Sequence, residues 1–261
     1  MTDRQWKAFV EYREWLKGKC HEWMAFAGEL SFLQKEALKK DNDKNKGKKT
    51  PEYPLETAVV YNKAYDDVQP QDEIKLIVIG DNPGKEEQLS KNNRYLVGQS
   101  GRIAEGFFRK NTELGIDFRK NVIIMNKTPV HTAKTLQLKY LYKNGSQGIK
   151  DLIIQSQELM AQKAAELHQK LIEGREANQK NPEMWLVGFS ELKEKGIFGR
   201  YRDILRQNYS DENWKNVYLY HHFSMNRFTV DLGKYIEKKG LPIEQALHEL
   251  GKEHRIEVYG E

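Results

Sequence analysis

The sequence predicts an α/β protein in which helices cover both faces of a central four-stranded parallel sheet, giving three layers. Four short apolar runs end abruptly at glycine or polar residues, and connections long enough to hold a helix separate them. Continuous apolar runs are typical of strands buried on both faces, and helical crossovers join parallel strands. The four runs are residues 74–79, 121–126, 185–188 and 217–220.

Residues 1–55 are predicted to form a helical extension that packs on a main domain of residues 56–261. Thr2 and Gln5 have the spacing of a capping box, and large apolar residues follow at helical spacing. Residues 39–49 contain no apolar side chain, which favours a solvated, flexible loop that tethers this helix to the sheet. A lysine-rich arm that contacts phosphates is the alternative interpretation.

The connections between the strands carry the periodicity of amphipathic helices. Ile103, Phe107 and Phe108 form an apolar stripe after the first strand. A long helix is predicted from about residue 146 to 175 after the second strand, and Pro182 ends that connection. Two shorter helices are expected after the last strand.

The composition indicates an intracellular, cytoplasmic protein with no membrane segment. Charged residues make up 31% of the sequence, and no apolar run approaches the roughly 20 residues that span a bilayer. The first residues have neither the apolar core nor the cleavage site of a signal peptide. The net charge of +5 is a modest basic bias, compatible with a polyanionic partner. We expect a monomer.

Cys20 is the only cysteine in the sequence, which excludes an intramolecular disulfide and an all-cysteine zinc or iron–sulfur site. The sequence also contains no Walker loop, GxGxxG, HExxH or GxSxG motif. The usual signatures of phosphate, dinucleotide, zinc-protease and esterase sites are therefore missing. We expect no metal ion and no other cofactor.

Polar side chains follow three of the four predicted strands. Asp81 and Asn82 come after the first, Asn126 ends the second, and His221 follows the last. Because parallel strands bring their carboxyl ends to one edge of a sheet, we expect these groups to converge there. Each has an ordinary alternative role, in a turn, as a cap or as a hydrogen-bonded imidazole.

These residue types suit chemistry on a heterocyclic base. Asp81 offers an acceptor or a base, and the amide of Asn82 can hold a water molecule. Asn126 carries an amide donor and acceptor together, which is the combination needed to recognise the edge of a heterocycle. His221 could stabilise a developing anion or shuttle a proton.

The order of the motifs GDNPG, RYLVGQSGR, MNKTP, LVG and HHFSMNR resembles the uracil-DNA glycosylase superfamily, over residues 74–228. That family opens its site with a Gly-x-x-Pro-Gly or Gly-x-Asp-Pro-Tyr loop and closes it with a His-Pro-Ser-Pro-Leu-like loop. Here His222 and Phe223 replace the expected pair in the second loop. The resemblance implies a uracil-DNA glycosylase-like fold without an iron–sulfur cluster. It also implies hydrolysis of the N-glycosidic bond of uracil or a related damaged base in DNA.

Catalytic roles are carried over from the family to three positions. Asn82 is similar to the residue that positions the attacking water, and Asp81 occupies the place of a glutamate in one branch. Either could be the acid–base residue. His221 is similar to the histidine that stabilises the departing uracil anion at its O2 atom.

Binding roles are carried over to further positions. Asn126 is similar to the asparagine that hydrogen-bonds the uracil edge, and Tyr95 or Leu96 lies where the family stacks an aromatic ring on the base. Met225 falls where the family has a leucine wedge that fills the space left by a flipped nucleotide. Possible contacts to DNA phosphates are Arg94, Lys127, Ser224 and Arg227.

Two other functions remain open for this sequence. One is a non-catalytic relative that keeps the pocket and binds nucleic acid. The other is a small-molecule or nucleotide hydrolase that uses the same crevice at the sheet edge.

Overall fold

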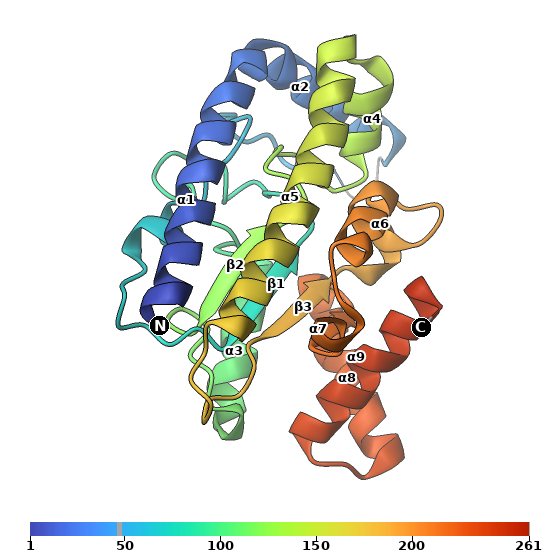
Figure 1. Cartoon of the computed structure of the whole chain (residues 1–261). Helices are drawn as coiled ribbons and strands as arrows, with labels where there is room; N and C mark the ends of the chain where they lie inside the picture. The colour runs from blue at the N-terminus through green and yellow to red at the C-terminus, as the bar shows by residue number, and fades with distance from the viewer. Residues whose placement is uncertain (46–48, 261) are drawn as a thin grey trace.

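A four-stranded parallel sheet forms the centre of the computed structural model, which describes residues 1–45 and 49–260 (Figure 1). The strand order is β2-β1-β3-β4 and every neighbouring pair is parallel. The four strands predicted from the sequence are therefore confirmed. Their bounds are β1 Leu76–Gly80, β2 Val122–Asn126, β3 Glu183–Val187 and β4 Val217–Tyr220.

Helices flank both faces of the sheet because each strand is apolar on both sides. In β1, Ile77 and Ile79 join one apolar cluster, whereas Leu76 and Val78 join the other. This alternation is what a pleated strand buried on both faces requires. The first cluster is covered mainly by α1 Asp3–Trp23, α5 Gln147–Glu173 and α6 Gly199–Gln207, and the second by α3 Gln99–Lys110, α8 Arg227–Lys239 and α9 Ile243–Tyr259.

The N-terminal helix α1 packs against α5 on one face of the sheet (Figure 1). It begins at the predicted capping box, in which the Thr2 hydroxyl accepts from the Gln5 N–H and the Thr2 N–H donates to the Gln5 side chain. Phe9 and Leu16 are fully buried in the same apolar cluster as the strands. The helix therefore contributes to the core of the α/β unit.

The predicted loop over residues 39–49 is wrong for its first part, because helix α2 runs over Ala27–Lys44. A 3-10 turn, Met24–Phe26, separates it from α1. Two hydrogen bonds to the segment after α2 hold its charged end: the Asn42 side chain and the Thr50 backbone exchange two hydrogen bonds of 2.8 Å. Residues 46–48 of the predicted loop lie outside the described residues.

The remaining helices complete the connections between the strands. The long helix predicted between the second and third strands is confirmed as α5, and α4 Gln137–Asn144 precedes it and packs against α2. A short helix, α7 Asp211–Trp214, leads into β4. Within the described part of the chain, no helix is both long enough and apolar enough to cross a bilayer.

Candidate functional site

The carboxyl ends of β1, β2 and β3 meet at a buried ion pair. Nζ of Lys127, which follows β2, donates to Oδ1 of Asp81 after β1 at 2.6 Å. The same ammonium donates to the carbonyl of Val187, the last residue of β3, at 2.7 Å. Lys127 is 0% exposed and Asp81 is 9% exposed. A buried charge is costly unless it is paired, so the Lys127 ammonium has to keep both of its partners. Because these partners lie at the ends of different strands, the contact holds the ends of β1, β2 and β3 together.

Two glycines make room for the polar side chains at this edge. A Cβ atom on Gly80 would lie 2.5 Å from Oδ1 of Asn126, its neighbour in the sheet register. Gly188 follows β3 with a φ of +83°, and a Cβ atom there would lie 2.5 Å from Oδ1 of Asp81. The strand ends therefore require glycine both for space and, at Gly188, for a left-handed backbone.

The side-chain amide of Asn126 lies at the end of β2, beside Gly80. Its side chain is 2% exposed, and its Nδ2 atom is buried with no hydrogen-bond partner among the described residues. Buried polar groups are normally paired because an unsatisfied donor costs about 1–3 kcal/mol. An orphaned amide at the carboxyl edge of a parallel sheet is therefore a candidate ligand-recognition group.

Asn82 is oriented by the loop that follows β2. Its Nδ2 atom donates to Oγ1 of Thr132 at 2.9 Å and to the carbonyl of Val130 at 3.2 Å. Both amide hydrogens are thereby engaged, and the Oδ1 atom remains as an acceptor on a partly exposed side chain. An acceptor of this kind can hold and orient a water molecule.

Glu87, which the sequence analysis did not identify, joins the loop after β1 to the segment before α3. Its two carboxyl oxygens accept from the backbone N–H groups of Gly84 and Leu96, each at 2.9 Å. Burial raises the pKa of Glu87 to about 7, although the two backbone donors act in the opposite direction. No sequence pattern marks this residue, because its partners come together only in the folded chain.

His131 supports the same loop from the other side. Its Nδ1 atom donates to the carbonyl of Pro83 at 2.8 Å, so its Nε2 atom accepts from the Tyr53 hydroxyl at 2.9 Å. Burial lowers the pKa of His131 to about 4, which keeps the ring neutral. The buried Nε2 of Gln34 in α2 donates to the His131 carbonyl at 2.7 Å, which links the N-terminal region to this loop.

The two adjacent histidines after β4 have different surroundings. The charges that act on His222 are those of Asp81 and Lys127, whereas those acting on His221 include Asp231 and His254. Burial lowers the pKa of both histidines. The ring of His221 packs beside Phe189, with centroids 4.8 Å apart. The predicted His221 is thus influenced by Asp231 and His254, whereas the charges of the Asp81–Lys127 pair act on its neighbour His222.

The tautomer of His222 follows from its backbone contact. The Ser224 N–H donates to Nδ1 of His222 at 3.0 Å, so Nδ1 carries a lone pair. In the neutral ring the proton is then on Nε2, which makes Nε2 a hydrogen-bond donor. No local pattern in the sequence distinguishes His222 from His221 for this position.

The turn that follows the histidines is exposed and has an unusual backbone. Met225 is 73% exposed, and φ is +54° for Met225 and +57° for Asn226. Left-handed conformations cost energy in residues other than glycine, and such strain clusters at functional sites. Ser224 is partly exposed and Arg227 is exposed, and the turn packs against α3.

Besides Asn126, three of the predicted binding residues are buried. Lys127, predicted as a possible phosphate contact, is enclosed by its ion pair and cannot reach a phosphate at the surface. Tyr95 is 1% exposed and its hydroxyl donates to the Val60 carbonyl, and Leu96 is 3% exposed. Arg94 is exposed and pairs with Asp67 at 2.6 Å.

Two sizeable cavities lie away from this edge. One of about 530 Å³ opens at the amino ends of the strands, beside Ile74, Glu183 and His248. Another of about 540 Å³ lies beside β2 and is lined by Arg94 and Tyr95, among others. Neither of these two cavities is lined by Asp81, Asn126 or His222.

No protein-family model matches the chain, and comparisons with curated proteins and with solved structures give no match either. The geometry of the carboxyl edge therefore carries the functional argument.

Proposed function

We propose that this protein is a DNA glycosylase that hydrolyses the N-glycosidic bond of uracil or a related damaged base. The observation that carries the proposal is the buried Nδ2 atom of Asn126, which has no hydrogen-bond partner in the part of the chain that the structure describes. An amide in this position can satisfy its lost hydrogen bond on the edge of a base that has been flipped out of the stack. The motif order that resembles the uracil-DNA glycosylase superfamily supports the same role.

Asn82 orients the water that attacks the sugar. Its Nδ2 atom is committed to Thr132 and Val130, so its Oδ1 atom accepts from the water. The water oxygen bonds to C1′ as the C1′–N bond breaks, and the electron pair of that bond leaves with the base. Asp81, held by Lys127 and by the Thr135 hydroxyl, supplies a fixed negative charge near the positive sugar.

His222 takes the role that the resemblance gives to His221. A neutral imidazole with its proton on Nε2 donates to the oxygen on which negative charge develops as the base departs. Removing one such donor typically costs about 10²–10³ in rate. The water's proton finally neutralises the departing base, which balances the hydrolysis.

DNA is held at the exposed turn after β4. Met225 acts as the wedge that fills the space of the flipped nucleotide, and Ser224 and Arg227 contact phosphates. Since Asn126 is 2% exposed, entry of the base requires the groups that cover this side chain to move. Contacts to phosphates make binding fall steeply as salt rises.

The test is cleavage of labelled oligonucleotides that carry one uracil, one hypoxanthine or one mismatched uracil, followed by alkali. Wild type is compared with Asn82→Ala, Asn126→Ala, His222→Ala and His221→Ala. Strand breakage at the lesion, lost in the first three variants, supports the proposal. No breakage on any substrate by the folded wild type contradicts it.

Binding of the same oligonucleotides, measured over a series of salt concentrations, separates the two other functions. A non-catalytic relative would retain oligonucleotide binding without breaking any strand. A small-molecule or nucleotide hydrolase would bind none of the oligonucleotides at any salt concentration.

A further inference from the structure

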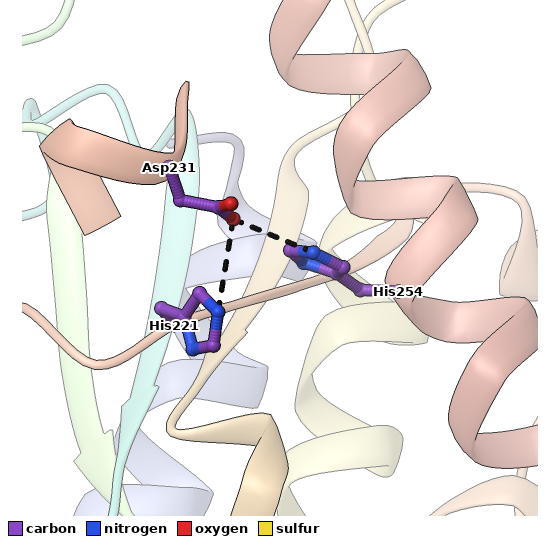
Figure 2. Close-up of side chains that lie close together, drawn as sticks. All are labelled: His221, Asp231 and His254. Atoms are coloured by element: carbon purple, nitrogen blue, oxygen red, sulfur yellow. Dashed lines mark ion pairs between the residues drawn. The ribbon is translucent and has the colours of Figure 1, made fainter. Parts of the chain in front are cut away.

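A second polar cluster lies beside the candidate site and joins β4 to the two C-terminal helices. It consists of His221 after β4, Asp231 in α8 and His254 in α9 (Figure 2). Nε2 of His254 lies 3.4 Å from Oδ2 of Asp231, and Nε2 of His221 lies 3.9 Å from the same oxygen. All three potential ligand atoms lie within 4.8 Å of one another.

The hydrogen bonds of His254 leave its second nitrogen without a proton in the neutral ring. Its Nδ1 atom lies 3.0 Å from the Leu219 carbonyl, and a carbonyl only accepts, so Nδ1 carries the proton. The lone pair of Nε2 then faces Oδ2 of Asp231. Two hydrogen-bond acceptors, Nε2 of His254 and Oδ2 of Asp231, thus face each other with no proton between them.

The Asp231 carboxylate also has an acceptor oxygen without a hydrogen-bond donor. Its Oδ2 atom is buried and accepts no hydrogen bond from any described residue. A buried carboxylate oxygen needs a donor or a cation, because unpaired burial of charge is costly. A cation between Oδ2 and the imidazole nitrogens satisfies every one of these atoms.

We propose that His221, Asp231 and His254 bind one divalent transition-metal ion, for which Zn²⁺ fits best. Two imidazoles and one carboxylate are ligands that suit zinc and are unlike the oxygen cages of Ca²⁺ and Mg²⁺. Zinc bonds of about 2.0–2.2 Å place tetrahedral ligands roughly 3.3–3.6 Å apart. The distance of 3.4 Å between His254 and Asp231 already matches this geometry, and the His221 ring, 3.9 Å from Asp231, would move inward to complete it.

The surroundings have two further properties of a metal site. The Leu219 carbonyl fixes the tautomer and orientation of His254 through Nδ1, as second-shell groups do for metal-bound histidines. The ring of His254 also stacks on Phe189, with centroids 4.3 Å apart, which restricts its rotation.

A fourth coordination position is left for water. The side chains of His221 and Asp231 are 29% and 30% exposed, whereas that of His254 is 11% exposed, so solvent reaches His221 and Asp231. Three protein ligands with a water in the fourth position are the arrangement found in catalytic zinc sites. The ion would tie the loop that carries His222 to α8 and α9, and it would stabilise the native chain.

The test is zinc binding by the full-length chain after dialysis against a chelator, with no DNA present. Titration calorimetry measures stoichiometry and affinity, Co²⁺ absorption reports the coordination, and thermal melting reports stabilisation. We expect one equivalent of Zn²⁺, a tetrahedral Co²⁺ spectrum and a higher Tm with metal. We expect Asp231→Asn and His221→Ala to weaken binding more than tenfold.

His248→Gln is the matched control, because this histidine also lies on α9 but pairs with Glu183 at 2.6 Å. It should bind zinc as wild type does. Absence of zinc binding by the wild type would overturn the proposal, as would unchanged affinity in both ligand variants. Since no nucleic acid enters the assay, its result is independent of the proposed glycosylase activity.

Discussion

Nζ of Lys127 lies 2.6 Å from Oδ1 of Asp81, in a position where the lysine has no contact with solvent. The ammonium also donates to the Val187 carbonyl, and it lies 5.2 Å from the centre of the Phe198 ring. One buried cation therefore connects the ends of three strands and orients the carboxylate that the candidate site presents. Its removal should disturb both stability and function.

Lys127→Met should lower the free energy of unfolding by about 3–5 kcal/mol, because the Asp81 charge would remain buried without its partner. Urea unfolding measures this change. The control is Lys134→Met, which breaks an exposed pair with Asp41 and should cost at most about 1 kcal/mol. Equal effects of the two substitutions would show that the buried pair has no special role.

Gly80→Ala should abolish most base release while the fold is retained. The added Cβ atom would lie 2.5 Å from Oδ1 of Asn126 and would displace that amide. A loss of at least about tenfold in cleavage rate is expected, since misplaced recognition groups are costly. Gly106→Ala in α3 is the control, because its Cβ atom meets nothing within 4 Å. Full activity of Gly80→Ala would contradict this account of Asn126.

Glu87→Gln should change how stability depends on pH. Burial raises the pKa of Glu87 from 4.5 to about 7, so between these values the native state holds a proton that the unfolded state releases. The protonated Glu87 therefore adds about 3 kcal/mol to the free energy of unfolding, and this contribution is fully present below about pH 4.5. It is lost as the pH rises through 7. The Gln variant lacks it.

The difference between wild type and Glu87→Gln isolates this effect. Burial lowers the pKa of His131 and of His168 to about 4 each, and those groups make stability rise with pH over an overlapping range. Both proteins contain the two histidines. At each pH between 4.5 and 8, the difference between their free energies of unfolding in urea therefore removes the contribution of the histidines. A difference that does not vary with pH would exclude a raised pKa for Glu87.

Met225→Ala should impair base release from duplex DNA by about tenfold and leave release from single strands nearly unchanged. The wedge matters only where a flipped nucleotide leaves a gap between stacked neighbours. Rates on matched duplex and single-stranded uracil substrates measure this. Val230→Ala in α8 is the control, since Val230 is also an exposed apolar side chain. Equal losses on both substrates would argue against a wedge.

The parallel sheet could be predicted from the sequence because its signal is local. Each strand is an apolar run with both faces buried, and β1 shows this in Leu76 and Ile77, which enter opposite clusters. The end of α2 could not be predicted in this way. Its polar residues are held in a helix by partners beyond the end of that helix, as the bonds between Asn42 and Thr50 show.

The strand-end residues were predicted in part. Their common edge followed from the parallel topology, and the structure brings Asp81 and Asn126 together around Gly80. The burial of Lys127 was not predictable, because it depends on a carboxylate from one strand and a carbonyl from another. The choice between His221 and His222 depends on the direction of the chain after β4, which no local pattern specifies.

Base release from duplex DNA with a single uracil, at enzyme excess, tests the central claim most directly. The comparison is between wild type, Asn126→Ala and Asn144→Ala, which removes an exposed amide at the end of α4. We predict release by wild type and Asn144→Ala, with a rate at least about 100-fold lower for Asn126→Ala. Equal rates for Asn126→Ala and wild type, or no release by any of the three folded proteins, would contradict the account.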